Sequence, residues 1–294
     1  MNIRLFARAA AASLAMIAVP GWAQAIEEKN LVSGKVKIEP DSGYIYLAGT
    51  TRQIGVFLKV PSAEDIAAYA KEWEDSFKKA QDKYAKAFSR WEYDRKLALK
   101  DKTKIPDRPV EPKAETFSIG DLETRNSVSF GPEFVFSKDK AGGNYSYMMK
   151  AKPGTYVYYG PIYFDPRAGA TGMCYCMGSV QFEVKAGAIT DLGNFLTAAP
   201  DSSLQKTAPG KKIVASGAFI SMKVDPNAST TGPVRFGLPD SLKSYPSAQA
   251  DFRAAAKMDN FFGLTVSRLP PVPGVLGYQR DKVVDLKAQT VSAN

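Results

Sequence analysis

One short segment carries both cysteines of the chain between two methionines: Met173-Cys174-Tyr175-Cys176-Met177. Thiolates and thioethers are soft ligands, which makes Cys174 and Cys176 a candidate copper site. If the strand expected over 179–185 continued backwards, both cysteines would face the core and both methionines the opposite face. The four sulfur atoms would then not converge. Two other states therefore stay open, a pair of buried thiols and a direct Cys174–Cys176 disulfide.

Histidine is absent from all 294 residues. This absence excludes Ser–His and Cys–His nucleophile pairs and His-ligated zinc or copper sites. Ser76-Phe77-Lys78-Lys79 matches the Ser-x-x-Lys pattern of penicillin-binding proteins, but no Lys-Thr-Gly or Ser-Asp-Asn element accompanies it. The chain is therefore expected to be non-enzymatic, and a glycosidase-like carboxylate pair among its 30 acidic residues remains the enzyme alternative.

The first 25 residues have the composition of a cleavable export signal. Arg4 and Arg8 flank the start of an apolar run over 9–19 that is too short to span a bilayer. Ala23-Gln24-Ala25 supplies a small-x-small cleavage site, so cleavage after Ala25 is expected. The mature chain is expected in the periplasm or outside the cell, and it has no later stretch near the ~20 apolar residues of a membrane span. Its basic excess, +9 for the whole chain, is too diffuse to favour nucleic acid.

Residues 62–115 are predicted to form an insertion that differs from the rest of the chain. Ser62 is a suitable N-cap, Glu64 and Asp65 place acids in the first turn, and no Gly or Pro follows until Pro106. The pattern predicts a helix of about 40 residues, ~60 Å long, followed by a Pro-rich extended return. Aromatic residues recur along it at helical spacings: Tyr69, Trp73, Phe77, Tyr84, Phe88 and Trp91.

This aromatic stripe is a candidate interaction surface for a protein partner or for a second copy of the chain. Alternatively, the helix lies across one face of the β-structure and buries the stripe there. A helix of this length would overhang strands that span only ~20 Å, which favours the interaction surface. A second aromatic set is a candidate platform for an envelope glycan, the alternative being packing within a sheet: Tyr145, Tyr147, Tyr156, Tyr158, Tyr159, Tyr163 and Phe164.

Short apolar and aromatic runs between turn residues predict a mainly β fold. The fold expected is an antiparallel β-sandwich over 26–200, interrupted by the helical and Pro-rich insertion, with a smaller α+β region over 201–294. The C-terminal region is expected to contain a strand over 213–224 and a short helix over 248–258. Strands are expected at 36–38, 44–47, 54–60, 128–130, 134–136, 145–149, 155–159, 179–185, 189–192 and 282–286.

Two stretches resemble a known structural pattern: Pro153-Gly154-Thr155-Tyr156 and the run from Phe182 to Gly193. They resemble a hairpin of exported bacterial β-sandwich modules of the prealbumin-like and carboxypeptidase-regulatory-like kind. The resemblance covers residues 150–195, implies a non-catalytic sandwich and carries over no functional residues. Together these features predict a non-enzymatic binding or structural protein of the cell envelope that acts through its aromatic helix. Soft-metal (copper) handling or thiol redox chemistry at Cys174 and Cys176 is the alternative function.

Overall fold

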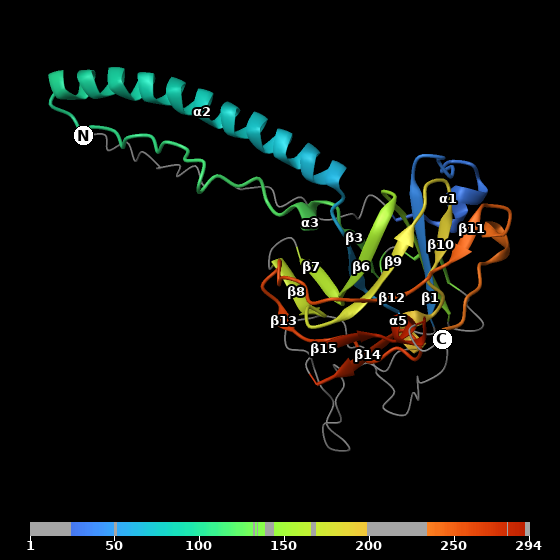
Figure 1. Cartoon of the computed structure of the whole chain (residues 1–294). Helices are drawn as coiled ribbons and strands as arrows, with labels where there is room; N and C mark the ends of the chain where they lie inside the picture. Colours follow the sequence, from blue (N-terminus) through green and yellow to red (C-terminus); the bar gives the residue numbers. More distant parts are fainter. Residues whose placement is uncertain are drawn as a thin grey trace, which may run out of the picture.

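The computed structural model describes residues 25–49, 52–131, 133, 135–138, 144–165, 169–198, 234–280 and 282–291. Within them the protein is mostly β, with several antiparallel strand pairs and one long helix (Figure 1), which confirms the expected class. The expected signal over residues 1–24 and the strand over 213–224 lie outside the described residues.

The first five-stranded sheet is built around β1, which pairs antiparallel with β5. On its other side β1 pairs parallel with β10, and β10 pairs parallel with β11, so this sheet is mixed. The strands in spatial order are β11 (Ser247–Gln249), β10 (Ile189–Asp191), β1 (Gly43–Gly49), β5 (Tyr145–Ala151) and β4 (Ser137–Lys138).

The second five-stranded sheet is antiparallel throughout. Its strands in spatial order are β12 (Arg253–Ala255), β9 (Ser179–Val184), β6 (Gly154–Gly160), β2 (Gly55–Lys59) and β3 (Val128–Phe130). Side chains from both sheets pack in one apolar core, with Ile45 and Leu47 from the first sheet and Phe57 from the second. Phe57 stacks on Phe130 with ring centroids 5.3 Å apart and meets Phe182 edge to face at 5.4 Å.

Shorter elements cover the outer faces of both sheets. A helix near the N-terminus, α1 (Glu28–Val32), places Leu31 in a cluster with Tyr46 of the first sheet. On the second sheet, Val56 and Leu58 pack with the strands β7 (Ile162–Asp165) and β8 (Gly169–Cys174). The remaining elements are α3 (Leu122–Arg125), α4 (Phe195–Ala198), η3 (Asp240–Leu242), β13 (Thr265–Val266), β14 (Leu276–Gln279), β15 (Lys282–Asp285) and α5 (Leu286–Val291).

Most of the expected strands are present, but three expected elements are wrong. Val135 and Phe136, the described residues of the strand expected over 134–136, form no strand, and β4 begins at Ser137. Residues 36–38 form no strand, although Val36 and Ile38 pack beside the first sheet. The helix expected over 248–258 is replaced by β11 and β12, which join different sheets. Cross-strand pairing has overridden the helical propensity of this alanine-rich stretch. The described part of 201–294 adds edge strands to both sheets, and its Phe252 lies in the shared core.

The long helix, α2 (Ala63–Lys100), extends away from the sheets (Figure 1). Its 38 residues correspond to about 57 Å at the usual helical rise. The predicted N-cap is confirmed, because Ser62 and Asp65 form a reciprocal capping box. We define the arm as residues 62–125, and the return segment as residues 101–121, which lead back from the end of α2 to α3. The arm is inserted between β2 and β3, which are neighbours in the second sheet.

Candidate functional site

The aromatic stripe of α2 faces the return segment of the same chain. Figure 1 shows this segment running back beside the helix. The rings of Trp73 and Phe77 stack with centroids 5.1 Å apart, and Phe117 of the return segment lies 5.8 Å from Trp73 and 5.2 Å from Phe77. All six rings of the stripe are half-buried. The stripe therefore holds the two halves of the arm together.

Hydrogen bonds fix the return segment along the helix. The hydroxyl of Tyr69 donates to the carbonyl oxygen of Gly120 at 2.7 Å. The indole nitrogen of Trp73 donates to the carbonyl of Phe117 at 3.1 Å, and that of Trp91 to the carbonyl of Pro106 at 2.9 Å. These three bonds span the helix from its first turns to its last third, so the return segment is held along most of its length.

Two arginines lie over rings of the stripe. The Arg108 guanidinium lies 5.1 Å from the ring centroid of Phe88 and 5.9 Å from that of Trp91. Arg125 lies 5.9 Å from the Tyr69 ring and pairs with Glu72 at 2.5 Å. Cations over aromatic faces are attracted by the ring quadrupole. The chain's own return segment thus packs along the stripe, an arrangement that the sequence alternatives did not include.

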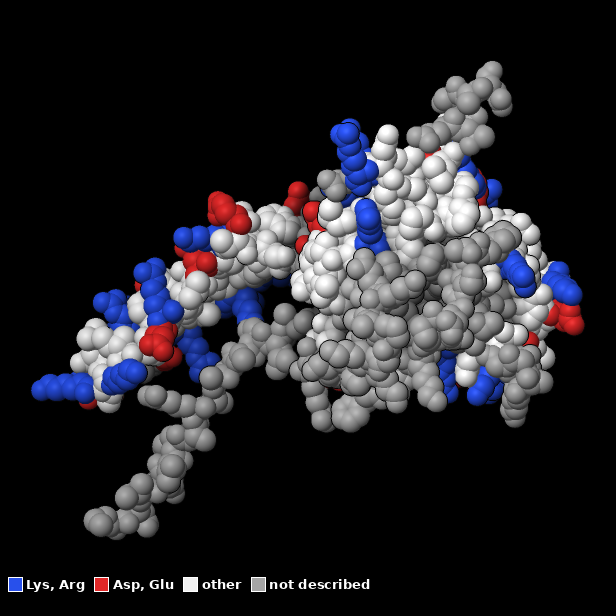
Figure 2. Space-filling model, turned by 90° about the horizontal axis from the view of Figure 1, so that it is seen from below, with Lys and Arg blue, Asp and Glu red and all other residues white. Residues whose placement is uncertain are grey.

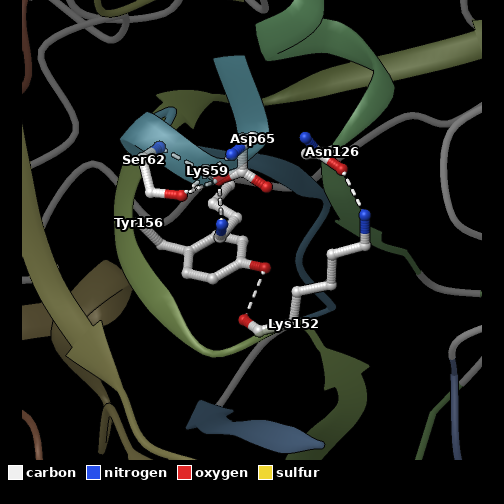
Figure 3. Close-up of polar contacts among 6 residues, drawn as sticks. All are labelled: Lys59, Ser62, Asp65, Asn126, Lys152 and Tyr156. Atoms are coloured by element: carbon white, nitrogen blue, oxygen red, sulfur yellow. Dashed lines mark hydrogen bonds and ion pairs between the residues drawn. The ribbon is translucent and has the colours of Figure 1, made fainter. Parts of the chain in front are cut away.

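A buried ion pair fixes the arm to the second sheet where α2 begins. Lys59, the last residue of β2, pairs with Asp65 in the first turn of α2 (Figure 3). Their side chains are only 6% and 13% exposed. Asp65 also accepts hydrogen bonds from the main-chain nitrogen and hydroxyl of Ser62. Gly154 leaves room for the lysine, since a β-carbon there would lie 2.7 Å from Lys59 Cε.

The Asp65 carboxyl has a strongly shifted acidity. Burial of the carboxyl raises its pKa, but the hydrogen bonds from Lys59 and Ser62 outweigh this effect and lower the pKa from its ordinary 3.8 to about 2. Asp65 is therefore ionised throughout the neutral and mildly acidic range. The ion pair fixes the direction in which α2 leaves the sheet, because one partner lies on a strand and the other on the helix.

The returning end of the arm has its own attachment. Lys152 donates from Nζ to Oδ1 of Asn126 at 3.0 Å, just after α3 (Figure 3). The carbonyl oxygen of Lys152 accepts a hydrogen bond from the hydroxyl of Tyr156 at 2.9 Å. Tyr156 is buried, and this burial raises the pKa of its hydroxyl. The returning end is thus attached to the turn that joins β5 of the first sheet to β6 of the second.

The sequence reasoning missed Lys59 as a fixing residue for the arm. One signal was present: Lys59 lies two residues after Phe57 in an apolar strand, at a position whose side chain should share the inward face. A charge at such a position requires a partner. Asp65 was recognised only as an acid of the first helical turn, and its link to the strand depends on the angle between helix and sheet.

Cys174 and Cys176 are joined in a disulfide, one of the three states left open by the sequence. Their Cα atoms are 5.1 Å apart, within the usual range for disulfides. The backward continuation of the 179–185 strand does not form, because β8 ends at Cys174 and β9 begins only after Gly178, whose φ is 142°. The burial expected for both cysteines is confirmed.

The four sulfur atoms of this segment do not share one environment. Cys174 and Cys176 lie in the cluster between the second sheet and the segment 258–264, whereas Met173 packs against the shared core. Met177 is exposed. Among the described residues no group of three or more Cys, His, Asp or Glu is arranged to hold a metal ion.

Native protein is expected to resist labelling by a thiol reagent and to bind no Cu(I), because both sulfur atoms are bonded to each other and buried. Labelling at two sites is expected only after unfolding in the presence of a reductant. Mass spectrometry of alkylated samples measures this directly. Stoichiometric copper bound by the native protein, and lost on Cys174→Ser, would contradict the expectation and restore the metal hypothesis.

The aromatic set considered for glycan binding is divided by the fold. Tyr147, Tyr156, Tyr158 and Tyr159 are buried. The other three rings are half-buried and lie on different strands, Tyr145 on β5 and the remaining two on β7. Arg52 and Lys138 lie over the Tyr145 ring. Most of this set therefore serves packing.

No family model, curated protein or solved structure matches the chain. No helix within the described ranges combines the length and apolar composition that crossing a bilayer requires.

Proposed function

We propose that this chain is a non-enzymatic, exported binding protein of the cell envelope, in which a β-sandwich carries the arm as its contact element. The sandwich is inferred from the two five-stranded sheets, which contribute side chains to one core from facing strands. The proposed partner is a component of the envelope or a second copy of the chain.

One observation supports the role of the arm most directly. β2 and β3 are antiparallel neighbours, with Phe57 opposite Val128, and a two-residue turn is enough to connect such strands. The fold therefore does not need the insertion. Its residues pack chiefly on one another, and Figure 1 shows that most of it projects beyond the sheets. A large, internally packed insertion that the fold does not need is best explained by a function outside the sandwich.

Export with cleavage after Ala25 is compatible with the packing of the next residue. The main-chain nitrogen of Ile26 donates to the carbonyl oxygen of Met148 at 2.8 Å, and its side chain is buried. Cleavage after Ala25 would leave both contacts in place, since an amino terminus also donates hydrogen bonds. The mature chain would thus begin at a residue that already belongs to the packed structure.

Photocrosslinking in cells that naturally make this chain tests the role of the arm. A photoreactive side chain at Leu99, which is exposed on the arm, is expected to give specific adducts. The matched control is the same side chain at Val266, exposed on β13 outside the arm, where few adducts are expected. Adducts from Val266 but not from Leu99 would place the contact element on the sandwich and overturn the proposal.

An armless variant tests whether the insertion is separable from the fold. Residues 61–125 are replaced by an Asn-Gly turn, and Lys59→Met removes the charge that would otherwise be buried without a partner. The variant is expected to stay folded. The free energy of unfolding of its sheets is expected to lie within ~1 kcal/mol of the value for the sheets of the full chain. Failure of the armless variant to fold would show that the arm serves the sheets.

A further inference from the structure

The far end of the arm carries exposed apolar side chains. We define the arm tip as residues 93–110, which include the last two turns of α2 and the chain reversal that follows. Five of the ten large apolar side chains that are exposed in the described part of the chain lie here. They are Tyr93, Leu97, Leu99, Ile105 and Val110, which are between 40% and 90% exposed. Such a concentration marks a surface that something else covers.

Cations surround these apolar side chains. Within residues 95–104 the chain has five basic residues and one acid, Asp101. All five basic side chains are exposed: Arg95, Lys96, Lys100, Lys102 and Lys104. Figure 2 shows Lys and Arg side chains reaching the far end of the arm. The tip is therefore both basic and apolar.

The chain reversal at the tip has a defined conformation. Main-chain nitrogens of Asp101 and Thr103 donate to the carbonyls of Leu97 and Ala98, which closes the end of α2. Lys102 adopts a φ of 53°, in the left-handed region where glycine is usual at helix ends. A lysine at this position is unfavourable for the backbone and adds an exposed cation directly after the end of α2.

We propose that the arm tip docks on an anionic lipid surface, an inference that rests on the proposed function of the arm. The basic side chains would meet lipid phosphates, and the neighbouring leucine, isoleucine and tyrosine side chains would enter the headgroup region. The excess of exposed basic side chains at the tip favours an anionic surface as the occupant. The helix would hold the sheets about 57 Å from that surface.

Vesicle co-sedimentation of the exported full-length chain tests this proposal. Binding to vesicles of phosphatidylglycerol and phosphatidylcholine is expected to be at least ~10-fold tighter than binding to pure phosphatidylcholine, and to weaken as salt is raised. The variant Lys100→Ser/Lys102→Gly/Lys104→Ser is expected to lose about 100-fold, since each cation near an anionic surface contributes roughly fivefold. Lys102→Gly also relieves the left-handed backbone, so loss of binding is not explained by an unfolded tip.

Two controls separate the outcomes. Lys71→Ser/Lys78→Ser/Lys79→Ser removes the same charge from exposed positions on the sheet-proximal half of α2, and it is expected to change binding less than twofold. Leu99→Ser is expected to weaken binding with no change in charge. Equal loss of vesicle affinity in the two triple-lysine variants, or no preference for anionic vesicles, would overturn the tip as a lipid site.

If the chain does not bind vesicles but crosslinks from Leu99 are still found, the lipid proposal is wrong and the proposed function stands. A dimer lost in the tip variant would make a second copy the occupant.

Discussion

Asp65→Ala is expected to lower the free energy of unfolding by about 3 kcal/mol, because removing one partner of a buried ion pair leaves the other charge buried and unpaired. The charge left behind is that of Lys59, whose side chain is 6% exposed at the end of a central strand. The substitution also removes the hydrogen bonds that Asp65 accepts from Ser62. Chemical denaturation followed by circular dichroism measures the change.

The exposed pair between Lys150 and Glu39 provides a matched control. Its side chains are 41% and 51% exposed, so Glu39→Ala is expected to cost less than about 1 kcal/mol. Adding Lys59→Met to Asp65→Ala is expected to restore most of the lost stability, since methionine fills the same space without a charge. If Asp65→Ala and Glu39→Ala lower the free energy of unfolding equally, the Lys59–Asp65 pair contributes no more than a surface ion pair.

The same pair gives the protein an acid-dependent stability. The folded-state pKa of Asp65 is about 2, below its ordinary value of 3.8, so the carboxylate stabilises the fold at pH values above the ordinary value. This contribution is lost as the pH falls from about 4 to about 2. Accordingly, the stability difference between the natural chain and Asp65→Asn is expected to shrink across this interval. A difference that stays constant down to pH 2 would contradict the lowered pKa.

Trp73→Ala is expected to open the arm without unfolding the sheets. The substitution removes ring contacts with Phe77 and Phe117 and the hydrogen bond to the carbonyl of Phe117. Half-buried as it is, the side chain should contribute about 2 kcal/mol to closure of the arm. Cleavage of the return segment by a protease is then expected to rise about 30-fold, since 1.4 kcal/mol corresponds to a factor of ten.

Tyr93 on the same helix is the matched control for this prediction. Its side chain is 63% exposed, and Tyr93→Ala is expected to change the cleavage rate less than about threefold. The denaturation midpoint of the sheets is expected to stay the same in both variants, because the arm packs on itself. Equal protease sensitivity in the two variants would show that the stripe does not hold the return segment.

The long helix was predictable because its signals are local. Ser62 caps it, Asp65 completes the capping box, and no Gly or Pro lies between Ser62 and Pro106. What covers the aromatic stripe was not predictable, since a Pro-rich segment has no periodicity that identifies a face. The structure shows why the return segment fits the aromatic stripe. The carbonyls of Pro106, Phe117 and Gly120 accept hydrogen bonds from Trp and Tyr side chains of the helix.

Long-range pairing limited the rest of the prediction. The strands around Phe57 and Tyr147 were expected because both carry strong β patterns. By contrast, the sequence of β11 and β12 predicts one helix. These residues form strands only because they pair with β10 and β9. The cysteine segment differs from the continuous strand considered for it because of a local feature. Gly178 interrupts the strand alternation on which the side-chain directions were based, although burial of Cys174 followed all the same.

Because α2 is long, a small change in its angle to the sheet moves its far end by a large distance. A tilt of about 5° where Lys59 meets Asp65 would displace the far end of the helix by about 5 Å, from the usual rise of 1.5 Å per residue. Small adjustments among Lys59, Asp65 and Ser62 would thus be magnified at the other end of the arm. How firmly these three residues fix the direction of α2 therefore decides how precisely the tip is positioned relative to the sheets.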